Sequence, residues 1–273
     1  MTLKVLIIQN KVAETVKDNM DHIYDLLERK KGEHFDFIVL PEMFLTPYEL
    51  MYFKLNKISE NDLVIQRLSD IASKFNSYLI AGSIPETSNG YIYNTSYIFN
   101  RQGKIINKYR KIHLFSVTYP DGKKFNEGDC LSAGNEVITF KTEFGQMGIM
   151  ICFDIRFPYL AKKIRDLDAK VIFVPAAFNT YTGPLHWHTT FKARATDNQI
   201  FFISASPARD SFGSYEPYGH SLVVDPYGKI LKELNASEGL LSIEIDLERI
   251  QEARQSIPII KNEVDISHFK VST

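Results

Sequence analysis

Three residue types along this chain could together perform nucleophilic chemistry: a thiol, a carboxylate and an ammonium group. Cys152 ends the apolar run "GQMGIMIC" and precedes a helical pattern, so it is predicted at a strand-to-helix turn. Such a turn can expose a nucleophile and free backbone N–H groups, which lower a thiol's pKa and bind an oxyanion. The alternative is a structural cysteine, because free cysteine is among the most often buried residue types.

Glu42 and Lys111 are the candidate partners of that thiol. Glu42 follows the apolar run "FDFIVLP". Burial there would raise its pKa and make it a better base, although a glutamate at a strand end can equally be solvated. Lys111 lies in "NKYRKIHLF", where a basic run passes directly into apolar residues. This position favours one inward-pointing cation, whereas a lysine in a basic run is otherwise usually solvated.

The elements that must position these residues alternate along the chain. Short apolar or β-branched runs, typical of strands covered on both faces, occur at 3–9, 35–42, 78–83, 93–100, 147–152, 170–178 and 200–206. Apolar residues at helical spacing predict helices over 16–27, 64–75 and 157–167. Pro158 fits only the first turn of the last helix, which therefore begins just past Cys152.

Two later segments, 220–234 and 239–246, are joined by turn residues and read as hairpin-like strands. Helices interspersed with buried strands predict an α/β layered fold. No linker, repeat or low-complexity segment divides the chain, so we expect one domain over residues 1–273.

The composition argues against several classes of partner. A formal net charge of −1 provides no basic footprint for nucleic acid or an acidic membrane. The apolar run at the N-terminus is too short for a signal-peptide core or a membrane span. Two cysteines, Cys130 and Cys152, are too few for a disulfide framework, so we expect a cytoplasmic protein with reduced thiols. His186 and His188 in "HWH" lack a third ligand nearby in the sequence, and we expect no bound metal.

Three segments together resemble the signatures of the nitrilase, or carbon–nitrogen hydrolase, superfamily. They are "LPE" with Glu42, "YRKIHLF" with Lys111 and "GIMICFDIRFP" with Cys152, in the family's order. The resemblance covers essentially the whole chain. It implies a four-layer α-β-β-α sandwich that forms a homodimer of eight layers, with the segment 257–269 lying across the partner. It also implies hydrolysis of a small-molecule amide without metal or organic cofactor.

The resemblance implies a role for each matching residue. Cys152 would be the nucleophile, Glu42 the general base and later acid, and Lys111 the cation that supports the tetrahedral intermediate together with the Phe153 N–H. Glu127 in "KFNEGDC" matches a second active-site glutamate, which orients the lysine or assists the leaving group. The alternative is an ordinary loop glutamate.

The segments "AFNTYTGPLHWH" and "SPARD" resemble the ω-amidase branch of the family. That branch hydrolyses the terminal amide of α-ketoglutaramate and α-ketosuccinamate. The "HWH" triplet is shared with the branch that hydrolyses deaminated glutathione, so this substrate and simple aliphatic amides stay open. A dianion-forming substrate requires a cation beyond the catalytic lysine. Arg156 is the better candidate and Arg209 the other, although Arg156 could instead pair with Asp154.

Other substrate contacts are expected from residues at or just beyond strand ends beside a signature, namely Tyr48, Phe178, Asn179 and Trp187. For the aromatic residues, packing in the core is an equal alternative. His113 lies two residues from Lys111 and would point the same way along a strand, either to contact substrate or to pack.

Two alternatives lie outside this chemistry. One is a cysteine–histidine hydrolase of another fold, because seven histidines are available, although the papain-like signature is absent. The other is a catalytically silent binding module of the same fold, against which the three intact catalytic residue types argue. Cys130 is assigned no role.

Overall fold

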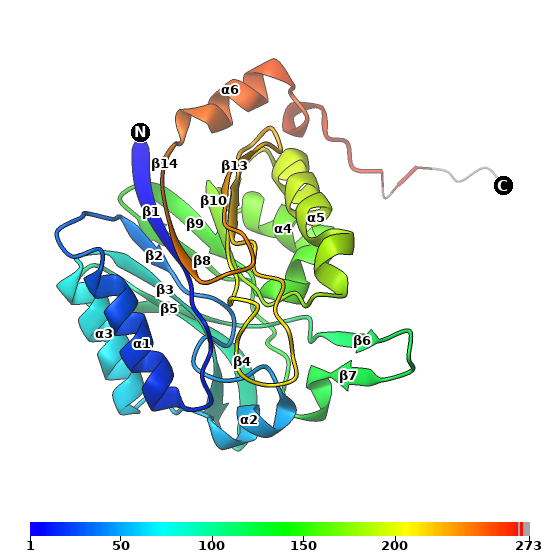
Figure 1. The fold of residues 1–273 in the computed structure, drawn as a ribbon. Helices are drawn as coiled ribbons and strands as arrows, with labels where there is room; N and C mark the ends of the chain where they lie inside the picture. The colour runs from blue at the N-terminus through cyan, green and yellow to red at the C-terminus, as the bar shows by residue number, and fades with distance from the viewer. Residues whose placement is uncertain (267, 270–273) are drawn as a thin grey trace.

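Two six-stranded sheets packed face to face form the centre of the protein (Figure 1), in a computed structural model that describes residues 1–266, 268 and 269. The first sheet consists, in spatial order, of β14 (Gly239–Asp246), β1 (Thr2–Gln9), β2 (Phe37–Val39), β3 (Tyr78–Ser88), β4 (Tyr91–Phe99) and β5 (Ile105–Arg110). The second consists of β13 (Ile230–Glu233), β12 (Leu222–Val224), β11 (Phe201–Ala205), β10 (Val171–Pro175), β9 (Gly145–Ile149) and β8 (Thr139–Thr142).

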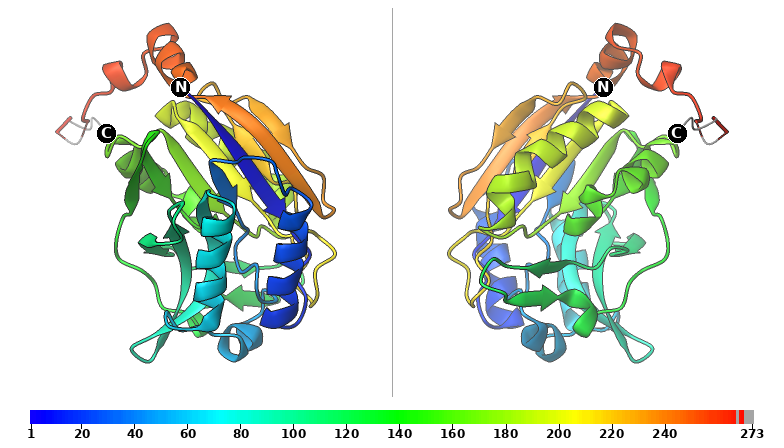
Figure 2. Two further views of the ribbon diagram at one scale, coloured as in Figure 1. Left: turned by 90° about the vertical axis from the view of Figure 1, so that its left-hand side faces the viewer. Right: turned by 90° about the vertical axis from the view of Figure 1, so that its right-hand side faces the viewer.

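Helices cover the outer faces of both sheets (Figure 2). α1 (Val16–Glu28) and α3 (Leu63–Lys74) lie on the first sheet, and α4 (Pro158–Arg165) and α5 (Thr182–Asn198) lie on the second. The predicted α-β-β-α layering is thus confirmed. No helix in the described residues has both the length and the apolar character needed to cross a membrane.

The remaining elements are short. They are α2 (Leu50–Leu55), α6 (Glu248–Ser256), the hairpin β6 (Ser116–Thr118) and β7 (Lys124–Asn126), and the 3-10 segments η1 (Glu127–Asp129), η2 (Cys152–Arg156) and η3 (Ile260–Asn262). After α6 the chain runs away from the two sheets (Figure 1). The predicted contact of this tail with a partner subunit stays a prediction.

The core follows from the two-residue period of the strands. In β1, Leu3, Val5 and Ile7 face the second sheet, whereas Leu6 and Ile8 face α1 and α3. Both sets are buried because one face meets a sheet and the other meets helices. This explains why the strand reads as a continuous apolar run rather than as an alternation.

Each sheet has a parallel centre, and this places the candidate site. β1, β2 and β3 run parallel, as do β9, β10 and β11. Parallel strands present their carboxyl ends at one edge of a sheet, where α/β proteins bind ligands. Glu42 follows β2 and Cys152 follows β9, so the two sheets bring these residues together at that edge.

Most predicted elements are present, with two differences. α4 begins at Pro158, as predicted, but ends at Arg165, so Leu167 lies beyond the helix and is 41% exposed. The apolar spacing does not predict α5 at all. Its buried line is narrow, with Trp187, Phe191 and Ala195 four residues apart, and polar residues occupy most of the positions between them.

Candidate active site

Cys152 lies at the sharp turn between β9 and α4. Its φ of +47° is in the left-handed region, which costs a residue with a Cβ of order 1–3 kcal/mol. Asp154 holds the turn by accepting hydrogen bonds from the Ile151 amide at 3.0 Å, the Tyr109 hydroxyl at 2.7 Å and the His113 amide at 2.9 Å. The buried thiol is therefore fixed at the start of η2, where the first N–H groups have no acceptor within the helix.

Glu42 is fully buried just past β2. Its Oε1 accepts hydrogen bonds from Lys111 Nζ at 2.8 Å, Asn94 Nδ2 at 2.8 Å and the Tyr48 hydroxyl at 3.2 Å. Its Oε2 is buried without a hydrogen-bond partner among the described residues. Burial raises the pKa of Glu42 and outweighs the opposing effect of Lys111. One oxygen of a basic carboxylate is thus free to accept a proton.

Lys111 lies between two carboxylates and is fully buried. Its Nζ is 2.8 Å from Glu42 Oε1 and 2.9 Å from Glu127 Oε2. Burial lowers the pKa of Lys111, but Glu127 and Glu42 outweigh that effect, so the net pKa is raised. Lys111 is therefore a permanent cation, and the structure confirms the inward orientation predicted from its sequence context.

Glu127, at the start of η1, is fully buried and fully hydrogen-bonded. Its Oε1 accepts from the Tyr48 hydroxyl at 2.6 Å and from Asn94 Nδ2 at 3.3 Å. Its Oε2 accepts from the Phe115 amide at 2.6 Å besides pairing with Lys111. A solvated loop glutamate is therefore ruled out. Because both of its oxygens are occupied, Glu127 is placed to orient Lys111.

The resting protonation of the site follows from these environments. Burial and the nearby Glu42 carboxylate raise the pKa of the Cys152 thiol well above its ordinary value, while Lys111 opposes this. At neutral pH the site therefore holds a protonated thiol. The free oxygen of Glu42 is the basic group beside this thiol.

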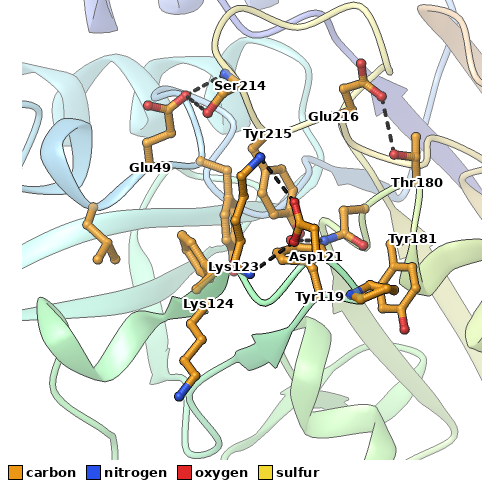
Figure 3. A pocket seen from close by; sticks show the side chains of 15 residues that line it. Glu49, Tyr119, Asp121, Lys123, Lys124, Thr180, Tyr181, Ser214, Tyr215 and Glu216 are labelled. Atoms are coloured by element: carbon orange, nitrogen blue, oxygen red, sulfur yellow. Dashed lines mark hydrogen bonds and ion pairs between the residues drawn. The ribbon is translucent and has the colours of Figure 1, made fainter.

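A small inner cavity adjoins the thiol. Its walls are Phe115, Cys152, Phe153, Arg156, Ala177, Phe178, Thr182 and Tyr215. An outer pocket of about 640 Å³ shares Tyr215 with it and opens to the surface (Figure 3). The rim of the outer pocket carries both charges, with Lys123 beside Asp121 on the β6–β7 hairpin and Glu49 bonded to Ser214. The outer pocket thus adjoins the cavity at Cys152 through Tyr215 and carries charged side chains at its rim.

Arg156 lines the inner cavity without a carboxylate partner among the described residues. Asp154 is occupied by Tyr109 and His113, so the alternative of an Arg156–Asp154 ion pair is wrong. Nη1 of Arg156 lies 2.8 Å from His186 Nδ1, and its Nε is buried without a partner. Its guanidinium lies 4.6 Å from the Phe178 ring centroid. Burial lowers the pKa of Arg156, as expected for a cation that lacks a counter-charge.

The other expected pocket residues divide between the site and the core. Phe178 lines the inner cavity, and Asn179 lines the outer pocket. Asn179 also fixes the start of α5, because its Oδ1 accepts from the Thr182 amide at 2.8 Å. Trp187 does not line either space: it is fully buried against Phe178, and its Nε1 donates to the His220 carbonyl at 2.9 Å. For Trp187 the core alternative is correct.

Two further expectations need correction. His113 lies beyond the end of β5, so it does not point alongside Lys111 on a strand. Its Nδ1 lies 2.7 Å from Asp154, and its ring stacks on Phe157 at 3.6 Å, which makes it a packing residue. Arg209 lies over the Tyr218 ring and donates to the Tyr218 carbonyl at 3.3 Å, outside both cavities.

Two residues of the site carried no role in the sequence interpretation. Asn94 donates to both Glu42 and Glu127. An asparagine within the strand-like run 93–100 is a signal that could have identified it, because a buried amide needs hydrogen-bond partners. Tyr215 stacks on Tyr48 with ring centroids 4.5 Å apart, and its hydroxyl donates to the Ala177 carbonyl. No local pattern distinguishes Tyr215.

Comparison with known proteins places this geometry in a family. The family model of carbon–nitrogen hydrolases matches residues 4–255. The chain is 43% identical to the ω-amidase NIT3 of Saccharomyces cerevisiae over 251 residues, covering 89% of this chain and 86% of the relative. It is 39% identical to the ω-amidase NIT2 of Mus musculus over 262 residues, covering 95% and 94%.

Solved structures agree with the sequence comparison. The crystal structure of Saccharomyces cerevisiae Nit3, described as a member of branch 10 of the nitrilase superfamily, superposes with a TM-score of 0.87 at 38% identity and covers 96% of each chain. The C. elegans NitFhit protein also superposes with a TM-score of 0.87, at 25% identity, over 96% of this chain and 65% of that one. The chain therefore belongs to the carbon–nitrogen hydrolase family of the nitrilase superfamily and is an amide-hydrolysing enzyme.

Proposed function

We propose that the enzyme hydrolyses the terminal amide of a small dicarboxylate monoamide, such as α-ketoglutaramate or α-ketosuccinamate, to the acid and ammonia. The observation that carries this proposal is the unpaired Arg156 in the cavity that holds the Cys152 thiol. A half-buried cation without a counter-charge is costly, and a substrate carboxylate would neutralise it. The names of the relatives, ω-amidases from yeast and mouse, support the same substrate class.

The spacing of thiol and cation suits a short substrate. Cys152 and Arg156 begin and end the same 3-10 segment, which rises about 2 Å per residue. Their backbones are therefore about 8 Å apart along the segment. Both side chains line the same narrow cavity, which suits a substrate whose amide and carboxylate are separated by only a few carbons.

In the acylation step, the Cys152 sulfur attacks the amide carbonyl while Glu42 Oε2 takes the thiol proton. The carbonyl oxygen becomes an oxyanion, which Lys111 and the Phe153 N–H stabilise. The protonated Glu42 then gives its proton to the amide nitrogen, the C–N bond breaks, and ammonia leaves a thioester on Cys152. Glu127 acts as a positioning residue, because its carboxylate fixes Lys111 at 2.9 Å.

In the deacylation step, Glu42 again acts as base. It removes a proton from the attacking water, whose oxygen adds to the thioester carbonyl, and the second tetrahedral intermediate expels the Cys152 sulfur. The proton returns to the sulfur, the acid product leaves, and the enzyme is restored. No step requires a metal or an organic cofactor.

The charge inventory of the buried site explains why one cation suffices. At rest, two carboxylates and one lysine give the site one net negative charge. Proton transfer to Glu42 neutralises one carboxylate at the same time as the oxyanion appears, so the net charge of the three groups and the oxyanion stays the same. During the attack the negative charge shifts from the Glu42 carboxylate to the oxyanion, and Lys111 stabilises both. Because no additional charge forms in the low-dielectric site, the reorganisation cost is low.

Ammonia release from a panel of amides tests the proposal. We expect α-ketoglutaramate to be hydrolysed faster than deaminated glutathione or a simple aliphatic amide, with no turnover in Cys152→Ala. Arg156→Gln should raise KM for the keto amide about 10- to 100-fold, because a charged hydrogen bond to the substrate is lost. The same variant should change KM for an uncharged amide little. Arg209→Gln, which removes an arginine outside both cavities, is the matched control and should change neither.

Each result has a distinct meaning. Faster turnover of deaminated glutathione or an aliphatic amide would refute the proposed substrate but keep the mechanism. Equal losses for charged and uncharged amides in Arg156→Gln would refute the role of Arg156 in recognising a carboxylate. Ammonia release that persists in Cys152→Ala would refute the thioester mechanism.

A further inference from the structure

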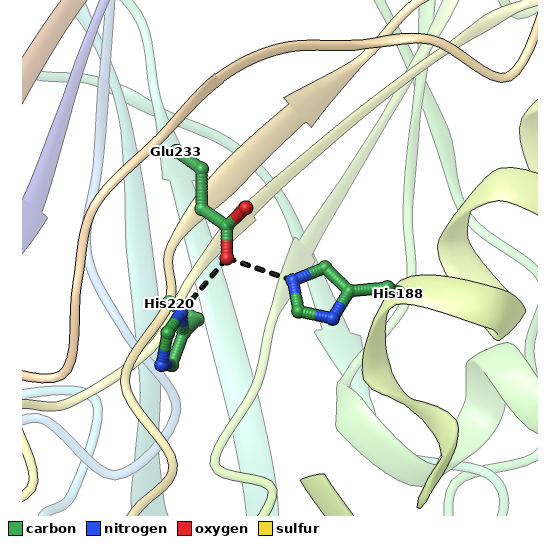
Figure 4. A group of neighbouring side chains, drawn as sticks. All are labelled: His188, His220 and Glu233. Carbon is green, nitrogen blue, oxygen red and sulfur yellow. Dashed lines mark hydrogen bonds and ion pairs between the residues drawn. The ribbon is translucent and has the colours of Figure 1, made fainter. Parts of the chain in front are cut away.

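A second group of chemically capable side chains lies outside the active site, on the second sheet and its covering helix (Figure 4). It consists of His188, His220 and Glu233, which we call the His–His–Glu cluster. His188 Nε2 lies 2.7 Å from Glu233 Oε1, and His220 Nδ1 lies 2.8 Å from the same oxygen. Within the described residues this is the one group of three histidine, cysteine or acidic side chains whose donor atoms all lie within 4.8 Å of one another.

Three separate elements supply the cluster. His188 projects from α5, His220 precedes β12, and Glu233 ends β13. The hairpin register pairs Leu222 with Glu233, which places His220 beside the carboxylate. Residues far apart in the sequence thus converge, and this is why "HWH" alone gave no third ligand.

The protein holds His220 in an unfavourable backbone conformation. Its φ is +61°, in the left-handed region that residues with a Cβ rarely adopt. The Asn235 carbonyl accepts its N–H at 3.1 Å, and the Trp187 indole donates to its carbonyl. The Tyr218 ring stacks on its imidazole with centroids 4.3 Å apart. Backbone strain that the surroundings enforce in this way is found at ligand-binding positions. The strained conformation of His220 directs its imidazole toward Glu233 and His188.

The donor set fits a first-row divalent metal. Two imidazoles and one carboxylate bind zinc in proteins, with a fourth position left for water. At bond lengths of about 2.0–2.1 Å, the donors of a tetrahedral site are about 3.3 Å apart. The carboxylate would therefore move about half an ångström from its present hydrogen-bonding distances. The side chains are half-buried, so a metal can enter from solvent while part of the site is shielded.

We propose that the His–His–Glu cluster binds one divalent transition-metal ion of the zinc class. The ion would tie α5 to the β12–β13 hairpin through three side chains. None of the three lines the cavities that lead to Cys152, so the site is structural rather than catalytic. It does adjoin active-site elements, because α5 also carries Thr182 in the inner cavity and His186 against Arg156.

Metal titration of chelator-treated protein tests the proposal. The full chain carrying Cys152→Ala, which prevents the catalytic thiol from binding metal, would be titrated calorimetrically with Zn²⁺. The same chain would be titrated with Co²⁺, followed by its visible d–d absorption. We expect one equivalent of each metal and a rise in Tm on binding. His188→Ala and Glu233→Gln should each weaken binding at least about tenfold.

Matched variants distinguish metal binding from a purely hydrogen-bonded contact among the three side chains. The amide oxygen in Glu233→Gln can still accept hydrogen bonds from both imidazoles. If the three side chains only form hydrogen bonds, this variant should therefore match the parent in the Tm of the metal-free protein and in the metal titrations. His34→Ala removes the imidazole of a two-residue pair with Asp36, which lacks a third donor, and should leave Zn²⁺ binding intact. The proposal is overturned if no saturable equivalent of Zn²⁺ binds, or if His188→Ala and Glu233→Gln bind it like the parent.

Discussion

Replacing Lys111 by methionine removes the cation that lies between two fully buried carboxylates, and it is the most severe test of the proposed electrostatics. Nζ of Lys111 lies 2.8 Å from Glu42 and 2.9 Å from Glu127, and all three side chains are fully buried. At an effective dielectric constant of about 20, each contact represents a gross attraction of about 6 kcal/mol. Desolvation offsets much of this, and the measured cost of removing one partner from a buried ion pair is about 3–5 kcal/mol.

We therefore expect Lys111→Met to abolish turnover and to lower the free energy of unfolding by about 3–5 kcal/mol at neutral pH. In a chain of this size, that corresponds to a loss of roughly 6–20 °C in Tm. Without the lysine, nothing opposes burial and the Glu127 charge at Glu42 to the same extent, so the pKa of Glu42 in the folded state rises further above the unfolded value of about 4.3. A carboxyl group whose pKa is higher in the folded state than in the unfolded state stabilises the protein fully at pH below its unfolded-state pKa. This stabilisation is lost as pH increases through its folded-state pKa. The deficit should therefore shrink as pH falls.

Urea unfolding of three variants, at neutral and mildly acidic pH, measures these effects. Lys17→Met is the matched control: Lys17 also pairs with a carboxylate at 2.8 Å, that of Asp21, but its side chain is 79% exposed. Its loss should change the free energy of unfolding little, because solvent screens an exposed ion pair. The double variant Lys111→Met/Glu127→Gln removes the uncompensated charge and should recover part of the stability lost in Lys111→Met, without recovering turnover.

Three outcomes would refute this account of the site. The first is a cost for Lys111→Met no larger than that of Lys17→Met. The second is a deficit that stays constant or grows as pH falls. The third is a double variant that is less stable than Lys111→Met, which would mean that Glu127 contributes packing or hydrogen bonding that outweighs its charge.

Three further predictions concern the same structure. Because burial raises the pKa of Glu42, kcat/KM should fall as pH decreases through a value above the ordinary 4.3 of glutamate, and a pH–rate profile flat to about pH 4 would contradict its role as base. Asn94→Leu removes a hydrogen-bond donor from both Glu42 and Glu127, so it should lower the free energy of unfolding in urea by about 2 kcal/mol and lower kcat. An unchanged kcat would show that Asn94 does not position Glu42. The family resemblance predicts a dimer formed by helix packing, so light scattering should find two chains. If the exposed face of α4 forms the interface, Tyr159→Lys (83% exposed on α4) should dissociate the dimer and Leu63→Lys (80% exposed on α3) should not; a monomeric parent would refute the predicted dimer.

Local sequence patterns were sufficient for an α/β layered fold and for the strand-end position of Cys152, whereas the four-layer arrangement was implied by the family resemblance. The strand runs and the helical spacing of α1, α3 and α4 record which face of each element is buried, and Pro158 fixes the start of α4 at N1. Because Glu42 and Cys152 directly follow such runs, their place at the carboxyl ends of strands could be predicted without knowing which strands are neighbours. The pattern failed for α5, where the line of buried residues is too narrow to give a clear period.

The tertiary structure decided which side chains meet. Lys111 pairs with two carboxylates that lie 69 residues before it and 16 residues after it, and no local pattern contains that choice. Tyr109 and His113 occupy Asp154, so the Arg156–Asp154 ion pair that the sequence left open as an alternative does not form. The physical reason is that periodicity reports burial one element at a time. Charge pairing, strain and metal-ligand geometry depend on distances between elements, which only the packed sheets fix.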